Sequence, residues 1–255
     1  SSYKKILPIF LLVQKQDTVF SMQLFYQEHI NPEDTSIVFT KDESRHIAKV
    51  LRKKEGDVLH VTNGKGYLFI AEIVQANPSQ CLAKITDQQA DTPKPYRLHL
   101  AIAPTKMNDR FEWFLEKATE IGIDEITPLL CDHSERKKIK LERYERVLQS
   151  AMKQSLHYRL PKLNQLIPFS EFLKKNEDEH CFIAHCEEAD KQLLSKSIPL
   201  QQSYTLLIGP EGDFSTAEID SAKEHHFKPV SLGNTRLRTE TAAIVGTHTF
   251  ALVHE

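Results

Sequence analysis

The chain has 255 residues, of which 40% are hydrophobic and 27% are charged. This length is enough for two modest domains or one large one, and the composition is ordinary for a soluble globular protein. The formal net charge of -2 excludes a globally basic nucleic-acid binder, so any contact with RNA must come from a local basic patch.

The first 21 residues differ in character from the rest of the chain. Lys4 and Lys5 precede a short apolar run, residues 6–13. The run is too short to span a bilayer, and no clear small-residue cleavage site follows it. We interpret residues 1–21 as an upstream extension outside the fold, with Met22 as a natural start; the alternative is an export signal.

Residues 22–92 are predicted to form a compact, barrel-like β module. Thr40 and Glu43 have the spacing of a capping box, so a short helix should begin there and run to about residue 51. The Asn-Gly-Lys-Gly sequence of residues 63–66 is a strong hairpin signal. Strands are expected at residues 58–61, 67–74 and 81–85. Such modules are common binding platforms, although the pattern alone indicates only a compact β domain.

A stiff linker separates this module from the rest of the chain. Two prolines within the polar residues 91–95 block both helix formation and strand pairing. From residue 96 to residue 255 strands and helices alternate, which favours an α/β domain built on a largely parallel sheet. Strands are expected at residues 97–103, 126–130, 181–185 and 204–208, and helices at residues 109–121, 140–158, 215–226 and 239–253. Gly122 should end the first helix, and Ser215 with Glu218 should form a capping box at the third.

The cysteines of the chain include no Cys-x-x-Cys pair, which is typical of reduced thiols in a cytosolic protein. A zinc site can be imagined from three cysteines and three histidines, but their spacing matches no compact ligand motif. These residues are Cys131, His133, His180, Cys181, His185 and Cys186. No metal is therefore expected.

Residues 208–215, with the sequence Ile-Gly-Pro-Glu-Gly-Asp-Phe-Ser, are the first candidate ligand-binding segment. They follow an apolar strand, and ligands of open α/β sheets bind beyond the carboxyl ends of strands. Gly209 and Gly212 would allow a ligand to approach the backbone closely. Glu211 and Asp213 would repel a phosphate, whereas S-adenosylmethionine offers a cationic centre and an adenine for backbone amides. For this segment alone, a plain strand-to-helix turn is an equal interpretation.

Residues 231–242, with the sequence Ser-Leu-Gly-Asn-Thr-Arg-Leu-Arg-Thr-Glu-Thr-Ala, are the second candidate segment. Arg236 and Arg238 share one face if the segment is extended, so they could hold an RNA phosphate or orient a substrate. Thr239 is expected to cap the last helix, and Glu240 suits the positive end of that helix. The competing interpretation is that both arginines form ion pairs with the acids of the first segment and merely fix the loop.

The order and spacing of these two segments resemble the signature of the RsmE family of 16S ribosomal RNA uridine-N3 methyltransferases, which belongs to the SPOUT class. Residues 46–57 are similar to part of that family's PUA-like N-terminal domain. Residues 106–122 resemble the family's lysine followed by a helix that ends in Glu-Ile-Gly, and residues 154–161 resemble a further element. The resemblance extends from Met22 to the end of the chain.

Two positions depart from the family pattern. Asp213 stands where the family usually has a second glycine, and Asn234-Thr235 stands where an arginine more often follows the glycine closely. The second departure is expected to reshape the cofactor loop slightly. Neither removes an indispensable group.

The resemblance implies two domains and a cofactor. Residues 22–92 would be a PUA-like RNA-binding domain, and residues 96–255 an α/β methyltransferase domain with a SPOUT-type trefoil knot, a rare feature that no pattern predicts. S-adenosylmethionine would be the cofactor. The implied cofactor-binding residues are Leu207, Ile208, Gly209, Pro210, Glu211, Gly212, Ser231, Leu232, Gly233, Leu237, Thr239, Thr241 and Ala242.

The implied reaction is methyl transfer to the N3 atom of a uridine in the 16S RNA of the small subunit. The protein would orient the reactants and assist loss of the N3 imide proton. Arg238 and Arg236 are the candidates for stabilising the resulting anion, and Glu211 is the candidate base, with anchoring of an arginine as its alternative role. The target base is expected to turn out of its stack.

Contacts with RNA are expected from local basic surfaces. The candidates are His46, Lys49, Arg52, Lys106, Arg110, Arg136, Lys137 and Arg159. The densest basic cluster, residues 136–146, is diluted by glutamates, so a solvated helix face is an equal interpretation of that cluster.

The last helix, residues 239–253, is nearly free of charge after Glu240, and a helix that is apolar all round must be covered on every side. In the family it would pack in the knot and against a second subunit. The expected partners are 16S ribosomal RNA, met in the assembled small subunit, and a second copy of the chain, with no membrane and no metal. The expected location is the cytoplasm.

Two other functions compete with this one. The first is another SPOUT activity, either ribose 2'-O or purine methylation. The second is a non-catalytic RNA-binding protein of the same fold. An α/β hydrolase is excluded because no Gly-x-Ser-x-Gly occurs in the chain.

Overall fold

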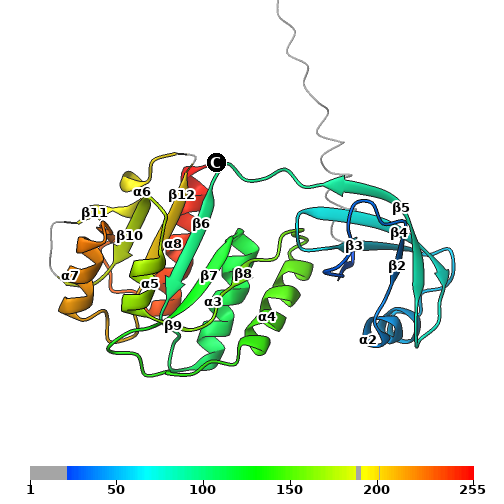
Figure 1. Cartoon of the computed structure of the whole chain (residues 1–255), viewed down its shortest axis with the longest axis horizontal. Helices are drawn as coiled ribbons and strands as arrows, with labels where there is room; N and C mark the ends of the chain where they lie inside the picture. The colour runs from blue at the N-terminus through cyan, green and yellow to red at the C-terminus, as the bar shows by residue number, and fades with distance from the viewer. Residues whose placement is uncertain (1–21, 188–190, 201) are drawn as a thin grey trace, which may run out of the picture. The chain divides into compact units, whose positions relative to one another are not determined.

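The structure, a computed structural model, describes residues 22–187, 191–200 and 202–255. Two compact units divide between Asp91 and Thr92 (Figure 1). The interpretation of residues 1–21 lies outside the described residues. Within those described, no helix combines the length and apolarity needed to cross a membrane.

The first unit is built on a five-stranded sheet with the order β1-β3-β4-β5-β2. β1 runs parallel to β3, and the other pairs are antiparallel. The predicted hairpin at residues 63–66 is confirmed, since it joins β3 to β4, with Gly64 and Gly66 at positive φ. The strands are β1 (Leu24–Tyr26), β2 (Ser36–Val38), β3 (Val58–Thr62), β4 (Tyr67–Gln75) and β5 (Leu82–Ala90).

A short helical segment packs on this sheet. Helix α2 (Lys41–Arg45) begins where the sequence predicts, because the Thr40 hydroxyl accepts a hydrogen bond from the amide of Glu43 (3.4 Å). It continues as a π-helical turn, η1 (His46–Val50), in which Ile47 is fully buried. The segment thus carries its basic side chains on a turn fixed by a core residue.

The second unit is built on an eight-stranded, entirely parallel sheet with the order β11-β13-β10-β12-β6-β7-β8 and with β9 beside β7. The predicted α/β class and parallel sheet are confirmed. The strands are β6 (Arg97–Ile102), β7 (Glu125–Leu130), β8 (Lys162–Leu163), β9 (Ile167–Pro168), β10 (His180–Ala184), β11 (Gln192–Leu193), β12 (Ser203–Ile208) and β13 (Lys228–Ser231).

Helices cover both faces of this sheet (Figure 1). One core lies under α3, α4, α6 and α8, and the other lies under α5 and α7. Alternate residues of β6 face the two cores: Leu100 points to the first and Ala101 to the second. The helices are α3 (Asn108–Ile121), α4 (Leu141–Gln154), α5 (Phe169–Lys175), α6 (Leu194–Ser197), α7 (Thr216–Glu224) and α8 (Thr239–Val253).

Two of the predicted helix signals, at α3 and at α7, are confirmed. Gly122 ends α3 in a left-handed conformation (φ 104°), and both hydrogen bonds of the Ser215 capping box are present at α7. The prediction that α4 extends to residue 158 is wrong. It ends at Gln154, because Leu156 adopts a left-handed backbone (φ 57°) that a helix cannot include.

Gly246 allows α8 to approach the sheet closely. A Cβ atom at this position would lie 2.5 Å from Cδ2 of Leu206, which is fully buried in β12. We expect Gly246→Ala to destabilise the unit by about 1–3 kcal/mol, although alanine favours a helix by about 1 kcal/mol. Urea unfolding measures the loss, with His248→Ala at an exposed position of α8 as the control. Equal stability of the two variants would show that the contact is not tight.

Candidate active site

Three loops meet at the carboxyl edge of the parallel sheet. β10 lies between β12 and β13, so the segments that follow these strands leave the sheet side by side. The loops begin at His185, Gly209 and Leu232. Both segments that the sequence singles out therefore lie together, at the edge where α/β sheets bind ligands.

Two adjoining cavities open among these loops, with volumes of about 410 and 580 Å³. Each volume is within the usual range for a small-molecule site. They share five lining residues, so they form one continuous hollow. The shared residues are Ala184, Cys186, Arg236, Leu237 and Ala242.

Asp213 ties the loop after β12 to the loop after β10. Its carboxylate accepts hydrogen bonds from the amides of Cys186 (2.7 Å) and Phe214 (2.9 Å). The residue has a left-handed backbone (φ 66°), a conformation that glycine adopts without a steric penalty. Aspartate tolerates this conformation because its side chain bonds locally, so the departure preserves the loop.

Thr239 joins the start of α8 to the loop after β12. Its hydroxyl donates to the carbonyl oxygen of Gly209 (3.0 Å), and the side chain is buried. The prediction that Thr239 caps α8 is therefore wrong: Arg238 occupies the capping position without a side-chain bond, and Thr239 is the first helical residue. The hydroxyl is used for tertiary contact instead.

The acids of the first segment do not hold the two arginines. Oε1 of Glu211 accepts a hydrogen bond from the amide of Lys106 (2.8 Å), and Asp213 is held as described above. Within the described ranges, neither Arg236 nor Arg238 forms an ion pair, and both are exposed on the hollow. The structure thus contradicts the interpretation that the arginines merely fix the loop.

The structure brings most of the predicted cofactor-binding residues to this hollow and leaves three off it. Those on it are Ile208, Gly209, Pro210, Glu211, Ser231, Leu232, Gly233, Leu237, Thr239 and Ala242. Leu207 is buried in the core beneath α5 and α7, Gly212 packs against His133, and Thr241 does not line the hollow.

Sequence reasoning missed the contribution of the loop after β10. Ala184, His185 and Cys186 line the hollow, and Lys191 lies beside them. Burial lowers the pKa of His185, so this ring is neutral at neutral pH. The available signal was the buried strand predicted at residues 181–185, since in a parallel sheet the residues after every strand reach this edge.

Comparison with known proteins identifies the family. The model of an RNA methyltransferase domain matches residues 92–251, and that of an RNA methyltransferase PUA domain matches residues 39–86. Ribosomal RNA small subunit methyltransferase E from Rickettsia conorii is 31% identical over 218 residues, which cover 83% of this chain and 88% of that protein. The chain belongs to the ribosomal RNA small subunit methyltransferase E family.

Solved structures of similar proteins agree with the assignment. A probable rRNA-methyltransferase from Porphyromonas gingivalis is 40% identical, with a TM-score of 0.84 over 91% of this chain and 98% of that one. The ribosomal RNA small subunit methyltransferase E of Neisseria gonorrhoeae, solved bound to S-adenosylmethionine, is 26% identical, with a TM-score of 0.80 over 89% of this chain and 95% of that one.

The predicted RNA-binding residues of the α/β unit lie around the methyltransferase hollow and beyond it. Arg110 lines it, whereas Lys137 and Arg159 are exposed elsewhere. Lys106 pairs with Glu135 (2.7 Å). The guanidinium of Arg136 donates to the carbonyl oxygens of Thr105 (2.9 Å) and Lys106 (2.5 Å), so this residue braces the loop after β6. His46, Lys49 and Arg52 lie in and just after η1 of the other unit. Their contacts with RNA stay predictions.

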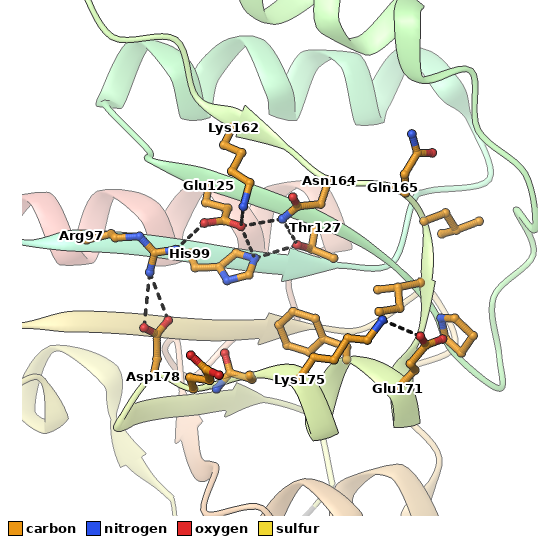
Figure 2. Close-up of a pocket in the computed structure, with 16 residues that line it drawn as sticks. Arg97, His99, Glu125, Thr127, Lys162, Asn164, Gln165, Glu171, Lys175 and Asp178 are labelled. Carbon is orange, nitrogen blue, oxygen red and sulfur yellow. Dashed lines mark hydrogen bonds and ion pairs between the residues drawn. The ribbon is translucent and has the colours of Figure 1, made fainter. Parts of the chain in front are cut away.

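A separate cavity of about 790 Å³ lies near the amino ends of β6, β7 and β10, away from the family motifs (Figure 2). Glu125 accepts a hydrogen bond from Lys162 (3.0 Å) and pairs with Arg97, which also pairs with Asp178 (3.3 Å). These four side chains thus form one network of ion pairs. We infer that this cluster stabilises the amino-terminal edge of the sheet.

A buried histidine completes this cluster. Nε2 of His99 lies 2.7 Å from the hydroxyl of Thr127, and the ring packs edge-on against Phe172. Burial lowers the pKa of His99 to about 4. Burial opposes the charge of Glu125, but hydrogen bonds from Asn164 and Lys162 and nearby charges outweigh it and lower its pKa to about 2.

Acid is expected to destabilise the α/β unit through His99. Its folded pKa of about 4 lies below the ordinary histidine pKa of 6.5, so this stabilisation is complete above pH 6.5 and is lost as the pH falls towards 4. Between pH 7 and about 4.5 the loss is about 2–3 kcal/mol. His99→Gln removes the titrating ring, so the variant should lose less unfolding free energy over this pH range, by that amount. Urea unfolding followed by the fluorescence of Trp113, the chain's single tryptophan, measures both; equal losses would contradict the shift.

Proposed function

We propose that the protein transfers a methyl group from S-adenosylmethionine to the N3 atom of a uridine in 16S ribosomal RNA of the small subunit. The observation that carries this proposal is the single hollow that both family motifs line at the carboxyl edge of the sheet. The names of its relatives and the S-adenosylmethionine bound to the Neisseria protein support the substrate class and the cofactor.

The residues of the hollow suit this cofactor. Gly209 has no side chain, so its backbone is accessible to a ligand in the hollow. Leu232, Leu237 and Ala242 add apolar surface for an adenine ring. Glu211 lies on the same hollow, and its charge disfavours a phosphate and favours a sulfonium. When bound, S-adenosylmethionine supplies an activated methyl group.

Three side chains are assigned to the chemistry at the uridine. Glu211 takes the imide proton of N3: Oε1 is occupied by the amide of Lys106, and Oε2 has no partner within the described part of the chain. Arg238 and Arg236 stabilise the negative charge that develops on the uracil ring. N3 gains the methyl group as the bond between methyl and sulfur breaks, and the imide proton goes to Glu211.

The path of the last segment supports a trefoil knot of the SPOUT type. After β13 the chain crosses back past β10 and begins α8 against the loop of β12, where Thr239 bonds to Gly209. The proposed domains are a PUA-like RNA-binding domain at residues 22–92 and the knotted methyltransferase domain at residues 96–255.

A second copy of the chain is the proposed partner of α8. Helices α3 and α8 pack together, and each exposes a large apolar side chain: Trp113 on α3 and Leu252 on α8. A homodimer would cover these side chains.

The proposed substrate is the assembled small subunit, and the proposed location is therefore the cytoplasm.

Transfer of labelled methyl groups tests the proposed function. The protein is incubated with S-adenosylmethionine carrying a tritiated methyl group and with small subunits, large subunits or free 16S RNA. We expect label in the RNA of small subunits and background label in that of large subunits. Label in large subunits alone, or no label in any sample, would overturn the proposal. More label in free RNA than in subunits would overturn the assembled subunit as the substrate.

A further inference from the structure

A buried carboxylate lies behind the rim of the hollow. Glu240, in the first turn of α8, is only 6% exposed. Among the residues that the structure describes, its buried Oε2 atom has no hydrogen-bond partner, while Oε1 lies 3.9 Å from Nε of Arg110. This distance allows electrostatic attraction but is too long for a hydrogen bond. The carboxylate is therefore only half compensated.

A buried carboxylate with only one partner lowers the stability of the fold, so its presence calls for a functional explanation. A buried polar atom without a partner costs free energy, and each case in a native structure calls for an explanation. The positive end of α8 favours an acid in its first turn, but a solvent-exposed acid would benefit equally. Burial of Glu240 beside one guanidinium instead points to Arg110 as its partner.

Arg110 lies at the rim of the hollow, where its guanidinium is accessible to a ligand. It belongs to the first turn of α3, its side chain is 40% exposed, and it lines the same cavity as Gly209 and Arg238. A guanidinium presents a rigid fork of donors that matches a phosphate. Nε is the guanidinium nitrogen nearest to Glu240, so the two terminal nitrogens can point away from the carboxylate and towards solvent.

We propose that Glu240 is a positioning residue that holds Arg110 at the rim of the hollow, where Arg110 binds a phosphate of the RNA backbone next to the target uridine. The inference rests on the proposed function. In the proposed complex Nε of Arg110 moves from 3.9 Å to hydrogen-bond distance of Oε1 of Glu240, while the terminal nitrogens bind the phosphate. Glu240 itself does not touch RNA.

A double-mutant cycle tests the coupling. The variants are Arg110→Ala, Glu240→Gln, which keeps the shape of the side chain and removes its charge, and the double variant. Each single change should raise the KM for small subunits about tenfold and leave the Kd for S-adenosylmethionine within twofold. The double variant should be no worse than Arg110→Ala. The proposal would be overturned if the KM of the double variant rose by the product of the two single increases.

The dependence of RNA binding on salt gives a readout that a merely structural role would not change. Loss of one phosphate contact should lower the slope of log Kd against log salt by about 0.7–0.9 in both single variants. Lys117→Ala is the matched control, because this lysine lies farther along α3 and pairs with Glu116 and Glu120. It should keep the slope of the unmodified protein. Unchanged slopes in Glu240→Gln would overturn the proposal.

Two outcomes separate this inference from its premises. If the unmodified protein binds small subunits but transfers no methyl group, the proposed function fails and the salt test still decides the role of Glu240. If Glu240→Gln does not fold, Arg110→Lys takes its place, since it keeps the charge but loses the fork. This variant should raise the KM with S-adenosylmethionine binding intact; an unchanged KM would overturn the phosphate contact.

Discussion

Replacement of Arg238 by alanine is expected to lower the rate of methyl transfer about 10²–10³-fold while the protein stays folded and binds S-adenosylmethionine. Arg238 is exposed on the hollow and forms no ion pair within the described ranges, so its removal leaves no buried charge without a partner. Loss of one group that stabilises a developing negative charge costs about 10²–10³ in rate. Transfer to small subunits under single-turnover conditions measures the effect.

The control for this variant is Lys228→Ala, which removes one positive charge from an exposed position at the start of β13. It should transfer methyl groups at the rate of the unmodified protein. Arg238→Lys distinguishes charge from geometry, since it keeps the first and loses the planar fork. A rate within threefold of the unmodified protein for Arg238→Ala would remove Arg238 from the mechanism.

Replacement of Gly209 by valine is expected to lower the affinity for S-adenosylmethionine at least about 100-fold. The Cβ atom would lie 3.1 Å from the ring and the amide nitrogen of Phe214, which is buried, so the loop would have to move. The added methyl groups would also keep a ligand from the backbone. Each factor of ten in affinity corresponds to about 1.4 kcal/mol. Calorimetric titration measures this loss directly.

Ala217→Val is the control for that titration, because it adds the same two methyl groups at an exposed position on α7. Its affinity should equal that of the unmodified protein. A melting measurement shows whether Gly209→Val folds, and Gly209→Ala offers a milder change if it does not. Unaltered affinity in a folded Gly209→Val would show that this loop is not a wall of the cofactor site.

Local signals predicted much of the fold. The Ser215 capping box, Gly122 and the hairpin at residues 63–66 each determine backbone geometry within a few residues, so the pattern is complete in the sequence. The end of α4 was not predictable in this way. The left-handed conformation of Leu156 has no glycine to mark it, and it accompanies a helix-ending hydrogen bond from the amide of His157 to the carbonyl oxygen of Met152 (3.1 Å).

The arrangement of the site depended on contacts between distant segments. The sequence predicted a role for residues 208–215 and 231–242, because glycines and charged residues follow apolar strands there. It did not show that β10 lies between β12 and β13, and so the contribution of Cys186 was missed. The use of Thr239 to bond Gly209, and the pairing of Glu240 with Arg110, likewise require the sheet order.

Transfer of the methyl group to N3 of a uridine is tested most directly by identifying the methylated nucleoside. Small subunits are treated with the protein and with S-adenosylmethionine carrying a heavy-isotope methyl group, and their 16S RNA is digested to nucleosides for mass spectrometry. The proposed function predicts one labelled product, 3-methyluridine, in a strongly reduced amount when Arg238→Ala replaces the unmodified protein. Label in a 2'-O-methylated nucleoside or in a methylated purine would contradict it, because the hollow would then present a different atom of the RNA to the methyl group.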